Sequence, residues 1–274
     1  MQLSVIMSTY NATAWLEKVL WGFAAQTFRE FEVVIADDGS GPDTADLIAR
    51  YAPRFPGRLL HEWHEDRGFQ KSAILNKAIV AARTPYLVFT DGDCIPRADF
   101  LAVHAARRRE GRFLSGGYVK LPLALSQRVT EDDVSTGRAF DPRWLARGGL
   151  TDPHALAKLG AGSLVSTVLN AATPTRASWN GHNASGWKRD LVAANGFDER
   201  MQYGGQDREL GERLENAGVR GIQIRYSAVC VHLDHSRGYK TEESMAKNTA
   251  IRAHTRTARV TRTPYGIVGE SGVA

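Results

Sequence analysis

Residues 86–93 read Tyr-Leu-Val-Phe-Thr-Asp-Gly-Asp, an apolar run that ends in two carboxylates separated by one glycine. The run follows Pro85, contains aromatic and β-branched side chains, and is typical of a short buried strand. Asp91 and Asp93 would then lie just past the carboxyl end of that strand. Because ligands of open α/β sheets bind at this edge, the pattern predicts a polar binding site there.

Strand and helix patterns alternate on the amino-terminal side of this run. Further strands are expected from apolar runs at 3–8, 31–36 and 58–63. Helices are expected over 14–25 with Thr13 as N-cap, over about 44–51 and over 71–82. This β-α-β-α order predicts a parallel, doubly wound sheet, and therefore an α/β fold.

The second half of the chain is less regular. Residues 126–180 are rich in Gly, Ser, Thr and Ala, and short helices with mobile loops are expected there. The remaining predicted elements are a helix over 99–109, a strand over 113–121, a helix closing at 191–196, an amphipathic helix over 207–217 and a strand over 227–232.

Composition excludes several classes of protein. No stretch approaches the roughly 20 apolar residues that span a bilayer, and no signal peptide is recognised. The two cysteines, Cys94 and Cys230, form neither a disulfide framework nor a zinc motif, which fits a reducing cytoplasm. A net charge of +5 and a pI near 9.3 indicate an anionic partner.

The carboxylate pair suggests a metal. Asp91 and Asp93, one residue apart on a turn with Gly92, can hold a hard divalent cation that bridges to a substrate phosphate. Mn²⁺ or Mg²⁺ suits such oxygen ligands. Lys71 and the free N–H groups that open the helix over 71–82 could face a diphosphate, although a solvated helix start explains them equally well.

Several motifs together resemble the family 2 glycosyltransferases of GT-A fold, with a carboxyl half similar to β-galactosyltransferases and chondroitin-polymerase-type enzymes. The resemblance covers residues 3 to 235. Its motifs are Ser4–Asn11, Gln26–Phe28, Asp37–Ser40, Asp91–Asp93, Asn183–Trp187, Asn195–Glu199, Gly204–Asp207 and Arg213–Gly218. It implies a Rossmann-like, mostly parallel sheet flanked by helices, with a helical insertion and a basic C-terminal tail.

The resemblance also implies roles for residues of the amino-terminal half. Ser8, Thr9 and Tyr10 would hold the nucleotide base, and Asp38 would accept an N–H from its ring. Asp93 is the expected direct metal ligand, and Asp91 would bind ribose or a metal-bound water. A histidine after the last strand serves relatives as a further ligand. His232 fits this position best and His235 is the alternate.

In the carboxyl half, Asp207 corresponds to the catalytic base, which removes the proton of the acceptor hydroxyl. An Asp at a helix start is otherwise a cap. Gln206 replaces the usual Glu, which leaves the acceptor undefined. The further residues expected to face acceptor or donor sugar are Asn183, Trp187, Tyr203 and Gly205, with a core role for Trp187 as the alternative.

The implied organisation has three parts. Residues 1–125 would bind the nucleotide-sugar, 126–235 would bind the acceptor and carry the base, and 236–274 would form the basic helix or tail. Residues 237–262 hold seven Lys or Arg and two Glu, which suggests peripheral contact with the inner face of a membrane. A solvated helix explains the same charges.

The function implied is metal-dependent, inverting transfer of a sugar, most simply from a UDP-sugar, to a saccharide or lipid-linked saccharide. Synthesis of bacterial surface polysaccharide or lipopolysaccharide is the pathway that the resemblance suggests. A nucleotidyltransferase is disfavoured because Ser8–Asn11 lacks a Gly-rich, basic phosphate loop. A non-catalytic polyanion or carbohydrate binder stays open. Nucleic acid is not an expected partner, since the basic residues form no stripe with interleaved aromatics.

Overall fold

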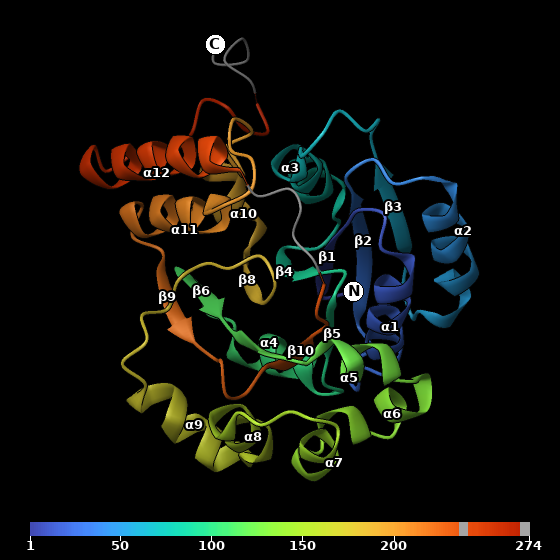
Figure 1. Cartoon of the computed structure of the whole chain (residues 1–274). Coiled ribbons are helices and arrows are strands. Elements are labelled where there is room, and N and C mark those ends of the chain that lie inside the picture. Colours follow the sequence, from blue (N-terminus) through green and yellow to red (C-terminus); the bar gives the residue numbers. More distant parts are fainter. Residues whose placement is uncertain (236–240, 269–274) are drawn as a thin grey trace.

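A computed structural model describes residues 1–235 and 241–268 of the chain. Its centre is a seven-stranded sheet of order β3-β2-β1-β4-β8-β6-β9, flanked by helices on both faces (Figure 1). The strands are β1 (Leu3–Thr9), β2 (Phe31–Asp37), β3 (Leu59–Trp63), β4 (Tyr86–Asp91), β6 (Arg112–Ser115), β8 (Ala184–Trp187) and β9 (Arg220–Gln223). Strands β1 to β4 pair in parallel, whereas β8 is antiparallel to both β4 and β6. The α/β fold with a mostly parallel sheet is confirmed.

A smaller sheet of order β5-β10-β7 lies beside the first. It consists of β5 (Cys94–Pro96), β7 (Gly117–Lys120) and β10 (Val229–His232). The prediction of one strand over 113–121 is wrong, because the chain leaves the large sheet at Gly116 and enters the small one. A Cβ at Gly116 would lie 2.1 Å from Asn183 Oδ1, so only glycine fits at this crossover.

The two faces of the large sheet are covered by different helices. One apolar core includes side chains of α1 (Thr13–Ala24), α2 (Pro42–Tyr51) and α4 (Phe100–Arg107). The other includes side chains of α3 (Lys71–Ala81), α10 (Lys188–Ala193) and α11 (Gln206–Asn216). Thr13 is the first residue of α1 and not its cap: the N-cap is Ala12, without a side-chain hydrogen bond.

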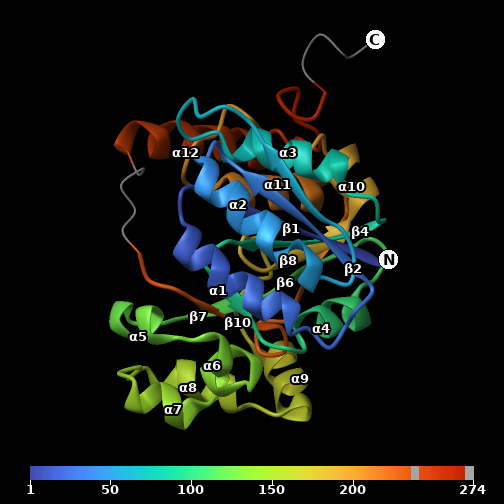
Figure 2. The same cartoon turned by 90° about the vertical axis from the view of Figure 1, so that its right-hand side faces the viewer.

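The predicted short helices of the middle region are confirmed. They are α5 (Leu123–Arg128), α6 (Glu131–Ser135), α7 (Pro142–Arg147), α8 (Pro153–Gly160) and α9 (Ser163–Ala172). The 3₁₀ helix η2 (Arg138–Phe140) lies between α6 and α7, whereas η1 (Ala52–Arg54) follows α2, outside this region. This insertion lies below α1 in Figure 2. Lys18 of α1 anchors it by donating to the carbonyls of Ser126, Gln127 and Val129.

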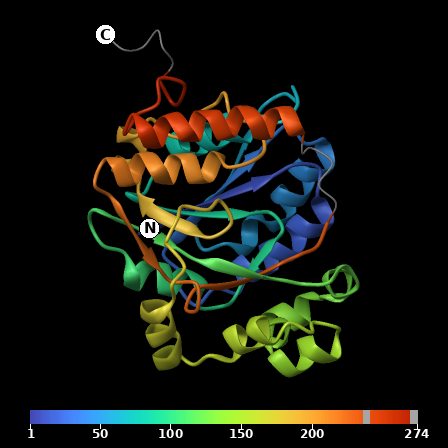
Figure 3. The ribbon, with the colours of Figure 1, turned by 60° about the vertical axis from the view of Figure 1, so that its left-hand side comes forward.

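The C-terminal helix α12 (Glu242–Thr257) lies along α11, as Figure 3 shows in red and orange. Arg252 and Arg256 both pair with Glu212 of α11. These two basic side chains therefore hold α12 against α11 and are not a free basic surface. The division of the chain into three parts stays a prediction. Residues 236–240 and 269–274 of the predicted tail lie outside the described residues. Among the helices described, none combines the length and the hydropathy needed to cross a membrane.

Candidate active site

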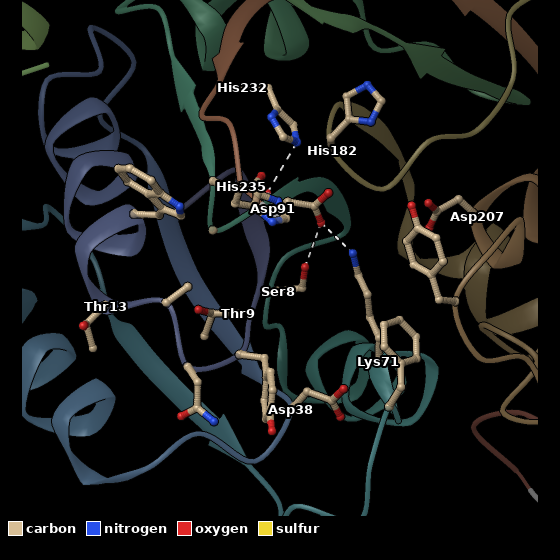
Figure 4. A pocket seen from close by; sticks show the side chains of 18 of the residues that line it. Ser8, Thr9, Thr13, Asp38, Lys71, Asp91, His182, Asp207, His232 and His235 are labelled. Atoms are coloured by element: carbon tan, nitrogen blue, oxygen red, sulfur yellow. Dashed lines mark hydrogen bonds and ion pairs between the residues drawn. The ribbon is translucent and has the colours of Figure 1, made fainter. Parts of the chain in front are cut away.

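A cavity of about 860 Å³ opens where strands β1, β2 and β4 end. This volume is in the range of small-molecule sites, roughly 300–1,000 Å³. The turns after these parallel strands form one wall, the starts of α3 and α11 form the opposite wall, and the small sheet closes the end (Figure 4). The lining residues that the sequence predicted are Ser8, Thr9, Tyr10, Asp38, Lys71, Asp91, Gly92, Asp93, Tyr203, Gln206, Asp207, His232 and His235.

Three predicted residues do not line this cavity. Asn183 is fully buried and donates to the carbonyls of Gly117 and Ala228, so it braces the two sheets against each other. Trp187 pairs with Tyr86 at the start of β4, because β8 runs antiparallel and carries it away from the edge where β4 ends. Gly205 has φ +87° as N-cap of α11 and therefore serves the turn.

Lys71 and Asp91 form an ion pair at the base of the cavity. Lys71 Nζ and Ser8 Oγ each donate to Asp91 Oδ1 over 2.7 Å. Burial alone would raise the pKa of Asp91, but the Lys71 ammonium outweighs burial and lowers the pKa to about 2. The same pairing, against the effect of burial, raises the pKa of Lys71. Both groups are therefore charged at neutral pH.

Asp93 lies within reach of both candidate histidines. Its Oδ2 is 2.8 Å from His235 Nε2 and 3.5 Å from His232 Nε2. Asp93, Cys94 and His232 each offer a ligand atom within 4.8 Å of the others. Burial raises the pKa of the Cys94 thiol well above its usual value, so it stays protonated. The carboxylate and the imidazoles are thus the better ligands for a divalent cation.

Asp207 faces Lys71 from the first turn of α11. Burial raises the pKa of this carboxyl, and the charge of Lys71 partly opposes the shift. Its Oδ1 is buried and has no hydrogen-bond partner among the described residues. Because Gly205 is the N-cap and no side chain caps the helix, Asp207 is not the cap that its sequence position could also have indicated. A buried carboxylate with a free oxygen on a cavity wall is suited to accept a proton.

The predicted base-binding end is built around Asp38 and Tyr10. Asp38 contacts His64 Nε2 at 2.8 Å and accepts the backbone N–H of Gln70. Burial raises the pKa of Asp38 while these two contacts oppose the shift. The Tyr10 ring is half exposed and its hydroxyl donates to Asp66. The ring is accordingly held at the cavity mouth with a face open to a planar ligand.

His182 is a lining residue that sequence reasoning missed. It follows Gly181, whose added Cβ would lie 2.8 Å from Asp207 Oδ1, and its ring contacts Tyr118. Burial lowers the pKa of His182 to about 4, so the imidazole is neutral. The sequence offered only a polar residue in a turn before a strand, and the neighbouring Asn183 carried the motif. Tyr118 and Phe69, which also line the cavity, and His64, which contacts Asp38, were missed for the same lack of a local signal.

Comparisons with known proteins find related glycosyltransferases. Residues 4–119 match the family described as "Glycosyl transferase family 2". A validoxylamine A glucosyltransferase of Streptomyces hygroscopicus subsp. jinggangensis is 29% identical over 79% of this chain and 52% of the relative. The uncharacterised glycosyltransferase YfnE of Bacillus subtilis is 26% identical over 91% of this chain and 69% of the relative. The chain spans about half the length of the Streptomyces relatives that it matches.

Solved structures show the same fold. Staphylococcus aureus TarS superposes with a TM-score of 0.61 at 16% identity, covering 94% of this chain and 41% of TarS. The mannosyltransferase PcManGT of Pyrobaculum calidifontis, in complex with GDP-Man and Mn²⁺, gives a TM-score of 0.55 at 20% identity, covering 94% and 70%. A shorter TarS structure in complex with UDP-GlcNAc gives 0.54 at 18% identity, covering 87% and 60%.

Proposed function

We propose that this chain, which belongs to the family 2 glycosyltransferases of GT-A fold, moves a sugar from a nucleoside diphosphate to an acceptor hydroxyl with inversion at the anomeric carbon. The observation that carries this proposal is that carboxylates lie on two opposite walls of one cavity. Asp91 and Asp93 lie at the strand edge, and Asp207 lies on the opposite wall. The first pair suits a diphosphate with its cation, and the single buried carboxylate suits a base.

The donor proposed is a UDP-sugar. A pyrimidine ring would pack on the exposed face of Tyr10, and Asp38 would accept the ring N–H. A Staphylococcus TarS structure contains UDP-GlcNAc, whereas PcManGT contains GDP-Man, so the base is a point for experiment. His182, a neutral imidazole on the cavity wall, is available to hydrogen-bond a hydroxyl of the donor sugar, since no hydrogen bond ties it to another described residue.

The residues beside Asp93 fit a divalent cation. Asp93 would be the direct ligand, with His232 and His235 beside it, at 3.5 Å and 2.8 Å from its Oδ2. Such a cation would act as a Lewis acid that stabilises the departing diphosphate. Lys71 adds a fixed positive charge next to Asp91, where phosphate oxygens would approach.

Asp207 would remove the proton from the acceptor hydroxyl as that oxygen attacks the anomeric carbon. A single displacement with one base inverts the configuration. Gln206 is compatible with this chemistry, because its Oε1 accepts the backbone N–H of Gly204 and so maintains the turn before α11. The acceptor class proposed is a saccharide or lipid-linked saccharide, within the synthesis of a bacterial surface polysaccharide.

Titration calorimetry with UDP, GDP and CDP, each with Mn²⁺ and with a chelator, tests the donor site. We expect UDP to bind most tightly and the chelator to weaken its binding at least tenfold. Equal affinity for all three nucleotides would refute the base assignment. Binding that the chelator leaves unchanged would refute the metal assignment, and no nucleotide binding at all would refute the proposed function.

A further inference from the structure

Helix α9 (Ser163–Ala172) is amphipathic, but it buries polar side chains and exposes apolar ones, the opposite of a usual surface helix. Its polar side chains Ser166 and Asn170 are buried, at 2% and 8% exposure. Its large apolar side chains face solvent. They are Leu164, Val165, Val168 and Leu169, with 86%, 55%, 65% and 36% of their surface exposed. We call these four side chains the α9 face.

Hydrogen bonds fix this orientation. Ser166 Oγ donates to the carbonyl of Ala161, Asn170 Nδ2 donates to Ser227 Oγ, and Asn170 Oδ1 accepts the N–H of Tyr226. Turning the helix to bury its apolar residues would break the two bonds of Asn170, which join α9 to residues 226 and 227. A contiguous apolar patch that is held outward by a polar anchor indicates an interaction surface.

The charges around the α9 face are cationic. No Asp or Glu occurs between residues 153 and 189, the stretch that contains α9. Arg107 donates to Thr167 of α9, and Arg225 donates to Thr175 just beyond it.

Two carboxylates are joined to this region through arginines, and both are already neutralised. Asp99 pairs with Arg97, which also binds the carbonyl of Ser227. Glu215 pairs with Arg176. These two ion pairs are neutral, so the positive charge beside the α9 face comes from Arg107 and Arg225.

We propose that the α9 face docks on an anionic lipid bilayer. Four exposed apolar side chains with a cationic rim suit shallow insertion at the headgroup level. The same face is too small for a stable dimer, which requires about 800 Å² from each partner. The surface differs from the predicted basic tail, whose Arg252 and Arg256 are paired with Glu212.

The position of α9 fits a peripheral contact. It lies at the rim of the molecule, on the side opposite α11 and α12 (Figure 1). Lys158 of the preceding helix donates to the carbonyl of Tyr118, a residue of the cavity wall. Docking would thus hold the small-sheet end of the cavity close to the bilayer. The inference does not rest on the proposed function, because lipid binding is measured without turnover.

Cosedimentation of the full chain with vesicles tests the proposal. The vesicles are phosphatidylcholine alone, or phosphatidylcholine with about 30% phosphatidylglycerol, at low and high salt. We expect partition into the anionic vesicles that weakens with salt. The double substitution Leu164→Glu and Val168→Glu should lower that partition roughly tenfold or more, since two inserted side chains are lost. Val80→Glu changes an equally exposed valine on α3 and should leave partition unchanged.

Three results would overturn the proposal. The first is no partition of the wild-type chain above the sediment found without lipid. The second is partition of the double variant equal to that of the wild type, which would show that another surface, such as the C-terminal segment, contacts the lipid. The third is a concentration-dependent dimer, seen by analytical ultracentrifugation, that the double variant abolishes while lipid binding is absent.

Discussion

Replacing Asp207 by Asn separates a catalytic role of this residue from a structural one. The two side chains are nearly isosteric, but the amide cannot accept a proton. Loss of a general base lowers the rate about 10²–10⁴-fold, which corresponds to roughly 2.7–5.5 kcal/mol of transition-state stabilisation at 1.36 kcal/mol per tenfold. No cap is lost, because Gly205 is the N-cap of α11 and no side chain caps it.

Stability should not fall in Asp207→Asn. The pKa of Asp207 is raised in the folded chain because burial disfavours its charged form. For an acid with a raised pKa, the folded state loses stability as pH rises from the unfolded pKa to the folded one, and the penalty persists above it. Removing the charge removes that penalty, so the variant should unfold at the same or a higher denaturant concentration at pH 7.

The assay compares transfer rate, nucleotide affinity and urea unfolding of the two proteins. Transfer should fall at least a hundredfold, with the affinity for UDP within about threefold of wild type, a change smaller than the roughly 1 kcal/mol of a typical hydrogen bond. The ratio of wild-type to variant rate should shrink as pH falls through the raised pKa of Asp207, since the wild type then loses its base. A variant that transfers sugar at near wild-type rate would refute the assignment.

Asp190→Asn is the matched control. Asp190 also has a buried oxygen without a hydrogen bond among the described residues and a pKa raised by burial. It lies on α10 and does not line the cavity. This variant should transfer sugar at the wild-type rate. A hundredfold loss in Asp190→Asn would show that the assay reports stability and not chemistry.

Three further substitutions test other parts of the site. Asp93→Ala should abolish transfer, and calorimetry should show that Mn²⁺ no longer changes its affinity for UDP, while the protein stays folded. Full activity of this variant in chelator would count against the cation. Asp38→Ala should weaken UDP binding about tenfold or more and reduce the preference for UDP over GDP and CDP. An unchanged preference would show that Asp38 does not bind the nucleotide base. Gly181→Ala brings a Cβ to 2.8 Å from Asp207 Oδ1 and should slow transfer up to about a hundredfold with normal UDP affinity; a wild-type rate would show that the position of the base is not critical.

The elements that the sequence predicted well are those whose signal is local. A short apolar run predicted the strand that ends at Asp91, and the helical spacing of apolar residues predicted the helix that begins at Lys71. Their parallel arrangement follows from the alternating order of elements, and with it the gathering of Asp38 and Asp91 at one edge. The metal and base candidates of the later half reached the same cavity because they follow a strand or begin a helix.

The errors come from pairings that sequence periodicity does not encode. Strand β8 inserts antiparallel between β4 and β6, so its direction sends Trp187 away from the site. Asn183 belongs to a family motif, yet its amide nitrogen donates to the carbonyls of Gly117 and Ala228 and does not face the cavity. Arg252 and Arg256 read as a free basic face because Glu212, their partner, lies on another helix.

The activity proposed for this chain is transfer of a sugar from a nucleotide donor. The most direct measurement is the release of nucleoside diphosphate from a panel of UDP-, GDP- and CDP-sugars with Mn²⁺, for the wild type and for Asp207→Asn, over a set of saccharide acceptors. We predict release from one or a few UDP-sugars that an acceptor stimulates and that Asp207→Asn lowers at least a hundredfold. Bound UDP without release from any donor would contradict catalysis, and equal release by both proteins would contradict the site.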